Sequence, residues 1–136
     1  MAKQIFINMA VKDVARATAF YEAIGAVKNA QFSDDTTSSM VISDTITVML
    51  MSHEKWSFFT KKPIVDAHQA SEVMLALSAD DRASVDRMTG AAGAHGGKAD
   101  VNPPQDHGFM YGRSFEDPDG HIWEVVYMDM SQMPQG

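Results

Sequence analysis

The chain has 136 residues, of which 45% are hydrophobic and 21% charged, a composition typical of a soluble globular protein. Its 18 acidic and 11 basic residues give a net charge of −7 at pH 7, and Lys61-Lys62 is the only basic pair. We therefore expect binding neither to nucleic acid nor to an anionic membrane. The absence of cysteine excludes disulfides, thiolate zinc sites and a cysteine nucleophile. With no signal peptide and no span of about 20 apolar residues, we expect a cytoplasmic protein.

The first half of the chain predicts a strand, a helix and three further strands. An apolar run over residues 5–11 favours a strand, and Asp13 can cap a helix over residues 14–24, where apolar residues recur at helical spacing. Gly25 is a helix stop signal. The later strands are expected over residues 27–32, 39–43 and 45–52.

The second half repeats this order after a less regular linker over residues 53–69, which contains Trp56 and two phenylalanines. A strand over residues 72–79 is followed by Asp81 as a cap and by a helix over residues 82–92. Residues 102–106, Asn-Pro-Pro-Gln-Asp, predict a loop. The remaining strands are expected over residues 97–101, 109–116 and 121–128.

The two halves match at a fixed separation. Adding 68 to the residue number takes Asp13 to Asp81 and Gly25 to Gly93, with no gap between the first strand and the helix stop. An ordered set of matches of this kind indicates an internal repeat. The sequence therefore predicts an α+β fold built from two βαβββ modules.

Two motifs resemble a known family. Residues 7–14, Ile-Asn-Met-Ala-Val-Lys-Asp-Val, and residues 19–25, Ala-Phe-Tyr-Glu-Ala-Ile-Gly, resemble the first-module signature of the glyoxalase, bleomycin-resistance and extradiol-dioxygenase (vicinal oxygen chelate) superfamily. Residues 115–124, Phe-Glu-Asp-Pro-Asp-Gly-His-Ile-Trp-Glu, resemble the signature that ends its second module, and residues 105–124 look most like bacterial predicted lactoylglutathione lyases. The resemblance implies a single glyoxalase-like domain over residues 1–136, whose modules curve their mixed sheets into a cup. The modules span residues 3–52 and 70–130, on either side of the linker at 53–69.

The resemblance also places the superfamily's metal ligands, usually His and Glu on the first and last strands of each module. These positions fall on Phe6, Met49, Met74 and Glu124. A phenyl ring cannot ligate a metal, and a thioether is a poor ligand for a hard dication. We therefore expect no metal cofactor at these positions.

Turn chemistry predicts which side chains share a face with Glu124. A Pro-Asp-Gly loop at residues 118–120 would pair Ser114 with Glu124 and Phe115 with Trp123. The resemblance implies that the Glu124 face lines the cup, and strand alternation then adds positions from the other strands. The expected ligand-binding residues are Phe6, Asn8, Met49, Met74, Met110, Ser114 and Glu124, with Trp56 and His107 at the edge.

Several of these residues also have structural interpretations that the sequence leaves open. Glu124 can be a carboxylate that is hydrogen-bonded to Ser114 and Asn8 and has no catalytic role. Trp56 can pack within the linker instead of contacting a ligand. His107 is a loop histidine, either structural or a base or ligand. We expect the His121 side chain to point away from Glu124. We expect Arg113, on the helix-facing side of the sheet, to pair with an acidic residue. The 11 methionines are either soft core fillers or the wall of an apolar pocket.

Three functions remain in competition. The first is a metal-independent small-molecule-binding protein, as bleomycin-resistance proteins are. The second is a lyase or isomerase, lactoylglutathione lyase-like, with Glu124 as catalytic general base in a dry pocket. The third is a relocated metal site that combines Glu124 with His107 or His121. By analogy with the superfamily we expect a homodimer.

Overall fold

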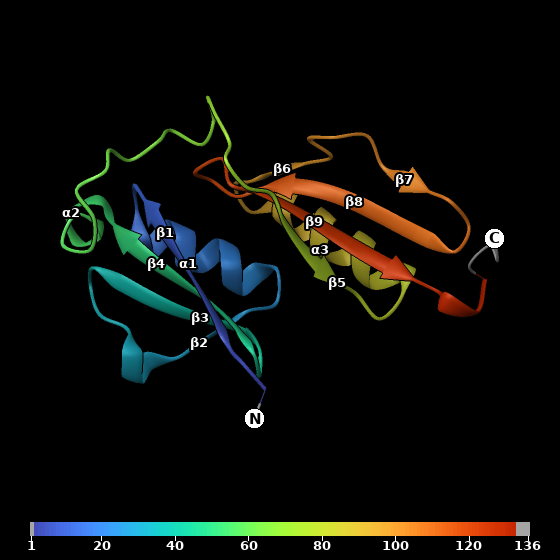
Figure 1. Ribbon diagram of the computed structural model, residues 1–136, viewed down its shortest axis with the longest axis horizontal. Helices are drawn as coiled ribbons and strands as arrows, with labels where there is room; N and C mark the ends of the chain where they lie inside the picture. The colour runs from blue at the N-terminus through green and yellow to red at the C-terminus, as the bar shows by residue number, and fades with distance from the viewer. Residues whose placement is uncertain (1, 133–136) are drawn as a thin grey trace. The chain divides into compact units, whose positions relative to one another are not determined.

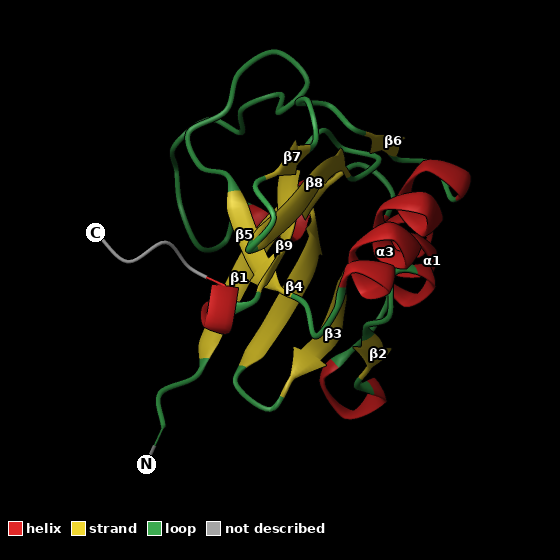
Figure 2. Ribbon diagram, turned by 90° about the vertical axis from the view of Figure 1, so that its right-hand side faces the viewer, coloured by secondary structure: helices red, strands yellow, loops and turns green. Residues whose placement is uncertain are grey.

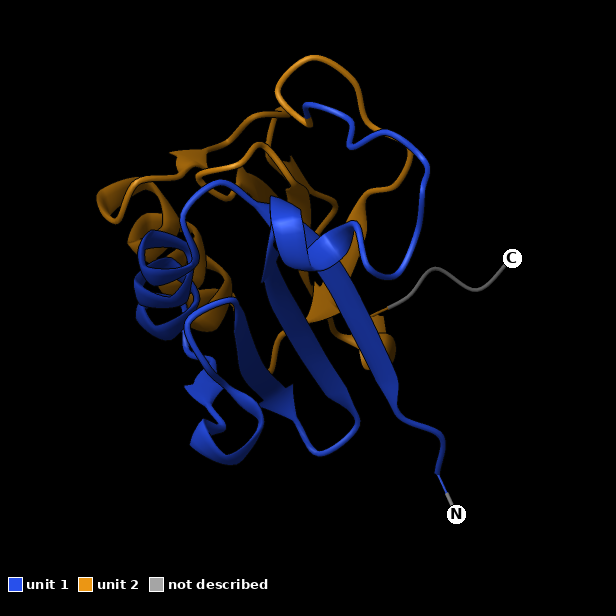
Figure 3. Cartoon of the chain, turned by 90° about the vertical axis from the view of Figure 1, so that its left-hand side faces the viewer, with its two compact units in different colours: residues 1–66 blue, residues 67–136 orange. Residues whose placement is uncertain are grey.

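A computed structural model describes residues 2–132 of the protein. The chain divides into two compact units, Met1–Asp66 and Ala67–Gly136, and Figure 3 colours them separately. The division falls inside the linker expected at residues 53–69. Among the described residues, no helix is both long and apolar enough to cross a membrane.

Unit 1 contains one four-stranded mixed sheet with a helix packed against it (Figure 1). The strand order is β1-β4-β3-β2, with β1 parallel to β4 and the other neighbours antiparallel. A 3-10 turn, η1 (Ala30–Phe32), lies between β2 and β3. The elements are β1 (Ile5–Val11), α1 (Val14–Ala23), β2 (Val27–Lys28), β3 (Thr37–Ser43), β4 (Ile46–Ser52) and a short helix α2 (His53–Trp56).

Unit 2 has the same connectivity (Figure 1). The strand order is β5-β9-β8-β6. Here β5 is parallel to β9, and the β9–β8 and β8–β6 neighbours are antiparallel. The elements are β5 (Leu75–Ser78), α3 (Arg82–Ala94), β6 (Lys98–Ala99), β7 (Gln105–Asp106), β8 (Met110–Glu116), β9 (Ile122–Met128) and a 3-10 turn η2 (Met130–Gln132). The two modules of the expected α+β fold are confirmed.

The repeat extends to the helix caps. The Asp13 carboxylate accepts the Arg16 N–H at 3.0 Å, and the Asp81 carboxylate accepts the Ser84 N–H at 2.7 Å. Each satisfies a backbone donor that the first helical turn leaves free. Both helices therefore begin directly after their caps, as predicted.

Each helix covers one face of the sheet in its own unit, and Figure 2 shows the helices in red beside the yellow strands. In unit 1 the core between α1 and the sheet contains fully buried Phe20, Tyr21, Val48 and Leu50. In unit 2 the corresponding core contains Val85, Phe115, Trp123 and Val125. Burying each of these large side chains contributes roughly 1.5–3 kcal/mol to folding.

The structure corrects three strand predictions. β2 ends at Lys28 rather than at residue 32, because the Asn29 side chain accepts the Gln31 N–H at 3.2 Å and caps η1. β5 begins at Leu75, so Met74 precedes the strand on which it was expected. The predicted loop after β6 contains a short strand, β7, which pairs with β8.

Candidate functional site

The β8–β9 hairpin fixes the face on which Glu124 lies. Ser114 is the cross-strand partner of Glu124, and Ala76 of β5 is its partner on the other side. Phe115 and Trp123 are also partners, one position along, so they point to the opposite face. The register is the one that the turn chemistry predicted, with Gly120 at φ +95° closing the loop.

The face opposite Glu124 is the helix-packed core. Phe115 and Val125 are completely buried and Trp123 is 1% exposed. The Glu124 side chain is half-buried on the other face of the sheet. The predicted face assignment of unit 2 is therefore confirmed.

Unit 1 presents the equivalent row of residues. Asn8 of β1 pairs with Met49 of β4, and Met49 pairs with Ser39 of β3. Because β1, β4 and β3 correspond to β5, β9 and β8, this row is equivalent to Ala76, Glu124 and Ser114 in unit 2. Met49 therefore occupies in unit 1 the position that Glu124 occupies in unit 2, as the family resemblance implied.

Glu124 has no hydrogen-bond or ion-pair partner among residues 2–132, whereas acidic residues on the helix side of unit 2 are paired. The alternative in which Ser114 holds this carboxylate is wrong. The Ser114 hydroxyl instead accepts the Asn102 N–H at 2.9 Å and donates to the Asn102 carbonyl at 3.2 Å. A half-buried carboxylate without a partner is free to accept a hydrogen bond from a ligand.

Large apolar side chains also lie exposed in each unit. Phe6 and Met74 are each 58% exposed, which is high for such large apolar residues. Met110 is the cross-strand partner of Met128, on the same face as Glu124. Glu116 also lies on this face, at the turn end of β8, so Glu124 is not its only ionisable residue.

The two edge residues, His107 and Trp56, are placed as follows. His107 is exposed in the β7–β8 connection, with Nε2 at 3.3 Å from the Gln105 side-chain oxygen. It follows β7 at the Met110 end of β8, and strand rise puts that end about 13 Å along the strand from Ser114. Trp56 ends α2 and is half-buried, and α2 lies against β4 and β1.

His121 is engaged on the side away from Glu124, as predicted. Its Nδ1 lies 2.7 Å from Oδ2 of Asp117, whose side chain is only 1% exposed. Burial alone lowers the pKa of His121, but the hydrogen bond and charge of Asp117, with the charge of Asp119, outweigh burial and raise it above its ordinary value. Asp117 also accepts the N–H groups of Asp119 and His121.

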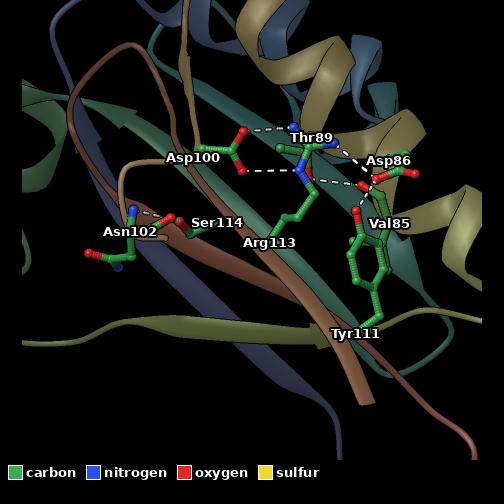
Figure 4. Close-up of polar contacts among 8 residues, drawn as sticks. All are labelled: Val85, Asp86, Thr89, Asp100, Asn102, Tyr111, Arg113 and Ser114. Atoms are coloured by element: carbon green, nitrogen blue, oxygen red, sulfur yellow. Dashed lines mark hydrogen bonds and ion pairs between the residues drawn. The ribbon is translucent and has the colours of Figure 1, made fainter. Parts of the chain in front are cut away.

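Arg113 pairs with acidic residues on the helix side, which confirms its predicted role (Figure 4). Its guanidinium donates two hydrogen bonds to Asp100, at 3.0 and 2.7 Å, and a third to Asp86 of α3 at 3.0 Å. The Tyr111 hydroxyl donates to Asp86 at 2.6 Å. The hydrogen bonds from Tyr111 and Arg113 hold the pKa of Asp86 below its usual value. This network fastens α3 and the segment after β6 to β8.

The donor chemistry at the four superfamily ligand positions does not suit a hard dication. Phe6 offers a phenyl ring, Met49 and Met74 offer thioethers, and only Glu124 offers an oxygen donor. Within the described part of the chain, no group of three or more His, Asp or Glu side chains is arranged to hold a metal.

Comparison with known proteins finds one family and many similar folds. Residues 3–125 match the family described as Glyoxalase/Bleomycin resistance protein/Dioxygenase superfamily. A hypothetical protein from S. aureus is 25% identical with a TM-score of 0.76, covering 93% of this chain and 95% of its own. No curated protein sequence matches the chain.

Two further solved structures are similar in fold. A glyoxalase-related enzyme from Fulvimarina pelagi has a TM-score of 0.77 at 17% identity, covering 100% of this chain and 94% of its own. A fosfomycin resistance protein from Mesorhizobium loti has a TM-score of 0.68 at 21% identity, covering 97% of each chain.

Proposed function

The chain belongs to the glyoxalase/bleomycin resistance protein/dioxygenase superfamily, and we propose that it binds a small, largely apolar molecule on the Glu124 face without the superfamily's usual metal. The unpaired, half-buried carboxylate of Glu124 on an otherwise mainly apolar sheet face carries this proposal. Binding sites are commonly apolar surfaces with a few polar groups that fix the ligand's orientation.

We propose that each module presents an equivalent ligand-binding face on its own sheet. Phe6, Asn8 and Met49 hold in unit 1 the positions that Met74, Ala76 and Glu124 hold in unit 2. Met110, Trp56 and His107 complete the proposed set of ligand-binding residues. We propose that the protein has no metal cofactor, because the superfamily's ligand positions hold a phenyl ring and two thioethers. Glu124 is the single oxygen donor among them.

Binding can be tested with two neutral aromatic probes, benzanilide and phenyl benzoate. Met74→Glu should weaken the binding of both by several-fold or more, because it places a second carboxylate near Glu124 and requires its desolvation. Met130→Glu is the matched control, since it adds the same charge at a 65% exposed methionine in η2. If the wild-type protein binds neither probe, the proposal is contradicted.

A lyase or isomerase is the second candidate, because an unpaired carboxylate in an apolar site can act as a general base. The substitution Glu124→Gln separates the two functions. A binding protein keeps most of its affinity for a neutral probe, since glutamine retains an oxygen acceptor. An enzyme that depends on the base loses turnover by roughly 10²–10⁴-fold, which for a lactoylglutathione lyase-like activity is measured as formation of lactoylglutathione.

A further inference from the structure

The segment between β6 and β7, residues 100–104, is fixed to β8 from both faces of the sheet; we refer to it as the strap. Neighbouring residues on β8 make the two attachments. Arg113, on the helix side, binds the Asp100 carboxylate through two hydrogen bonds. Ser114, on the Glu124 side, binds both backbone polar groups of Asn102. Figure 4 shows Asp100 with Arg113 and Asn102 with Ser114 on either side of β8.

The backbone is strained at Asp100, the first residue of the strap. Asp100 has φ +54°, the only positive φ of a non-glycine residue in the range 2–132. Its N–H still donates to the Ser114 carbonyl at 2.7 Å, while its side chain reaches Arg113 on the other face. A left-handed residue costs about 1 kcal/mol or more, so the surrounding contacts must hold it. The strap therefore crosses the edge of β8 in one defined conformation.

This conformation leaves the Asn102 amide unused. Both main-chain groups of Asn102 are satisfied by Ser114, but its side chain makes no hydrogen bond within the described residues and points away from Arg113 (Figure 4). Asn102 is half-buried. It is attached to Ser114, whose Cβ lies about 5 Å from that of its partner Glu124. Two unpaired polar side chains thus lie on either side of Ser114.

We propose that Asn102 is a specificity-determining residue of the Glu124 site, and that the two side chains together recognise an amide group attached to an apolar body. This inference rests on the proposed function. An ionised carboxylate only accepts hydrogen bonds, whereas an asparagine amide can donate two. Glu124 accepts the ligand's N–H and Asn102 donates to its carbonyl oxygen. Because the strap is already fixed, little conformational entropy is lost when the ligand binds.

Three probes, each with two phenyl rings joined by a two-atom linker, separate the two contacts. Benzanilide has both the N–H and the carbonyl, phenyl benzoate lacks the N–H, and N-benzylaniline lacks the carbonyl. Dissociation constants and the Asn102 side-chain NH₂ resonance can be followed in one ¹⁵N–¹H NMR titration. The wild-type protein should bind benzanilide roughly 5–10-fold more tightly than either of the other probes, as expected for one net hydrogen bond.

The variants give opposite patterns. Asn102→Ala should abolish the preference over N-benzylaniline and keep the preference over phenyl benzoate, while Glu124→Ala should do the reverse. Ser114→Ala should act like Asn102→Ala, because it releases the strap, and Pro103→Ala should match the wild type. Equal affinity for all three probes in the wild type overturns the role of Asn102 but leaves the proposed function intact. Binding of none of them overturns both.

Discussion

Replacing Asp117 by Asn tests how the turn beside Glu124 is held. Oδ1 of Asp117 accepts the N–H groups of Asp119 and His121, and Oδ2 lies 2.7 Å from Nδ1 of His121. Asparagine keeps an oxygen for the two N–H groups. It replaces the acceptor of His121 by an NH₂ group, which cannot accept a hydrogen bond from a protonated imidazole.

The expected loss depends on pH through the charge of His121. The folded-state pKa of His121 is raised above its ordinary value, because Asp117 outweighs the effect of burial. Stability from this pair is therefore fully present below the ordinary histidine pKa and is lost as pH rises through the folded pKa. A hydrogen bond to a charged group contributes about 1.5–3 kcal/mol, and the 24% exposure of His121 favours the lower end.

Thermal unfolding at about pH 5.5 and about pH 9 measures the effect. Asp117→Asn should lower Tm by about 5–7 °C at the lower pH, at roughly 3–4 °C per kcal/mol, and by much less at the higher pH. Asp119→Asn is the comparison, since it removes only the smaller charge contribution to His121 and keeps the hydrogen bond with Asp117, so its loss at the lower pH should be smaller. An equal loss at both pH values, or none at the lower one, would refute the role of the charged pair.

Three further changes have defined outcomes. Gly120→Ala should destabilise the protein by about 3 kcal/mol in chemical denaturation, because a Cβ there would lie 2.6 Å from the backbone nitrogen of His68, at φ +95°. Arg113→Lys should cost about 1 kcal/mol in the same assay, because lysine cannot bind Asp100 through two parallel hydrogen bonds; unchanged stability would count against the network. Light scattering should give the mass of a homodimer, and a mass of 14.9 kDa at micromolar concentration would rule the dimer out.

The sequence was sufficient for features that depend on local rules. Asp13 and Asp81 cap their helices because a short carboxylate reaches the free N–H groups of the next turn. The Pro-Asp-Gly loop set the register of β8 and β9 and hence the face of Glu124. Strand alternation likewise placed Asn8 and Met49 together on the face of the unit 1 sheet opposite its buried core.

Features that depend on contacts across the sheet could not be predicted in this way. The hydrogen bonds of Ser114 go to the backbone of Asn102, and backbone groups carry no sequence signal. The positive φ of Asp100 falls on a residue that is not glycine, so no turn motif marked it. Asn102 lies directly before two prolines, and the sequence indicated only that it is part of a loop. That its side-chain amide is unpaired follows from the three-dimensional structure of the strap.

Metal content tests most directly whether this site works without a resident metal. Protein purified without an immobilised-metal column can be analysed by mass spectrometry for zinc, nickel, iron and manganese, together with the Glu124→Ala variant. We expect well below one ion per chain in both, because Phe6, Met49 and Met74 leave Glu124 as the single oxygen donor at the superfamily's ligand positions. Stoichiometric metal in the wild type that is lost in Glu124→Ala would contradict the proposed metal-independent binding.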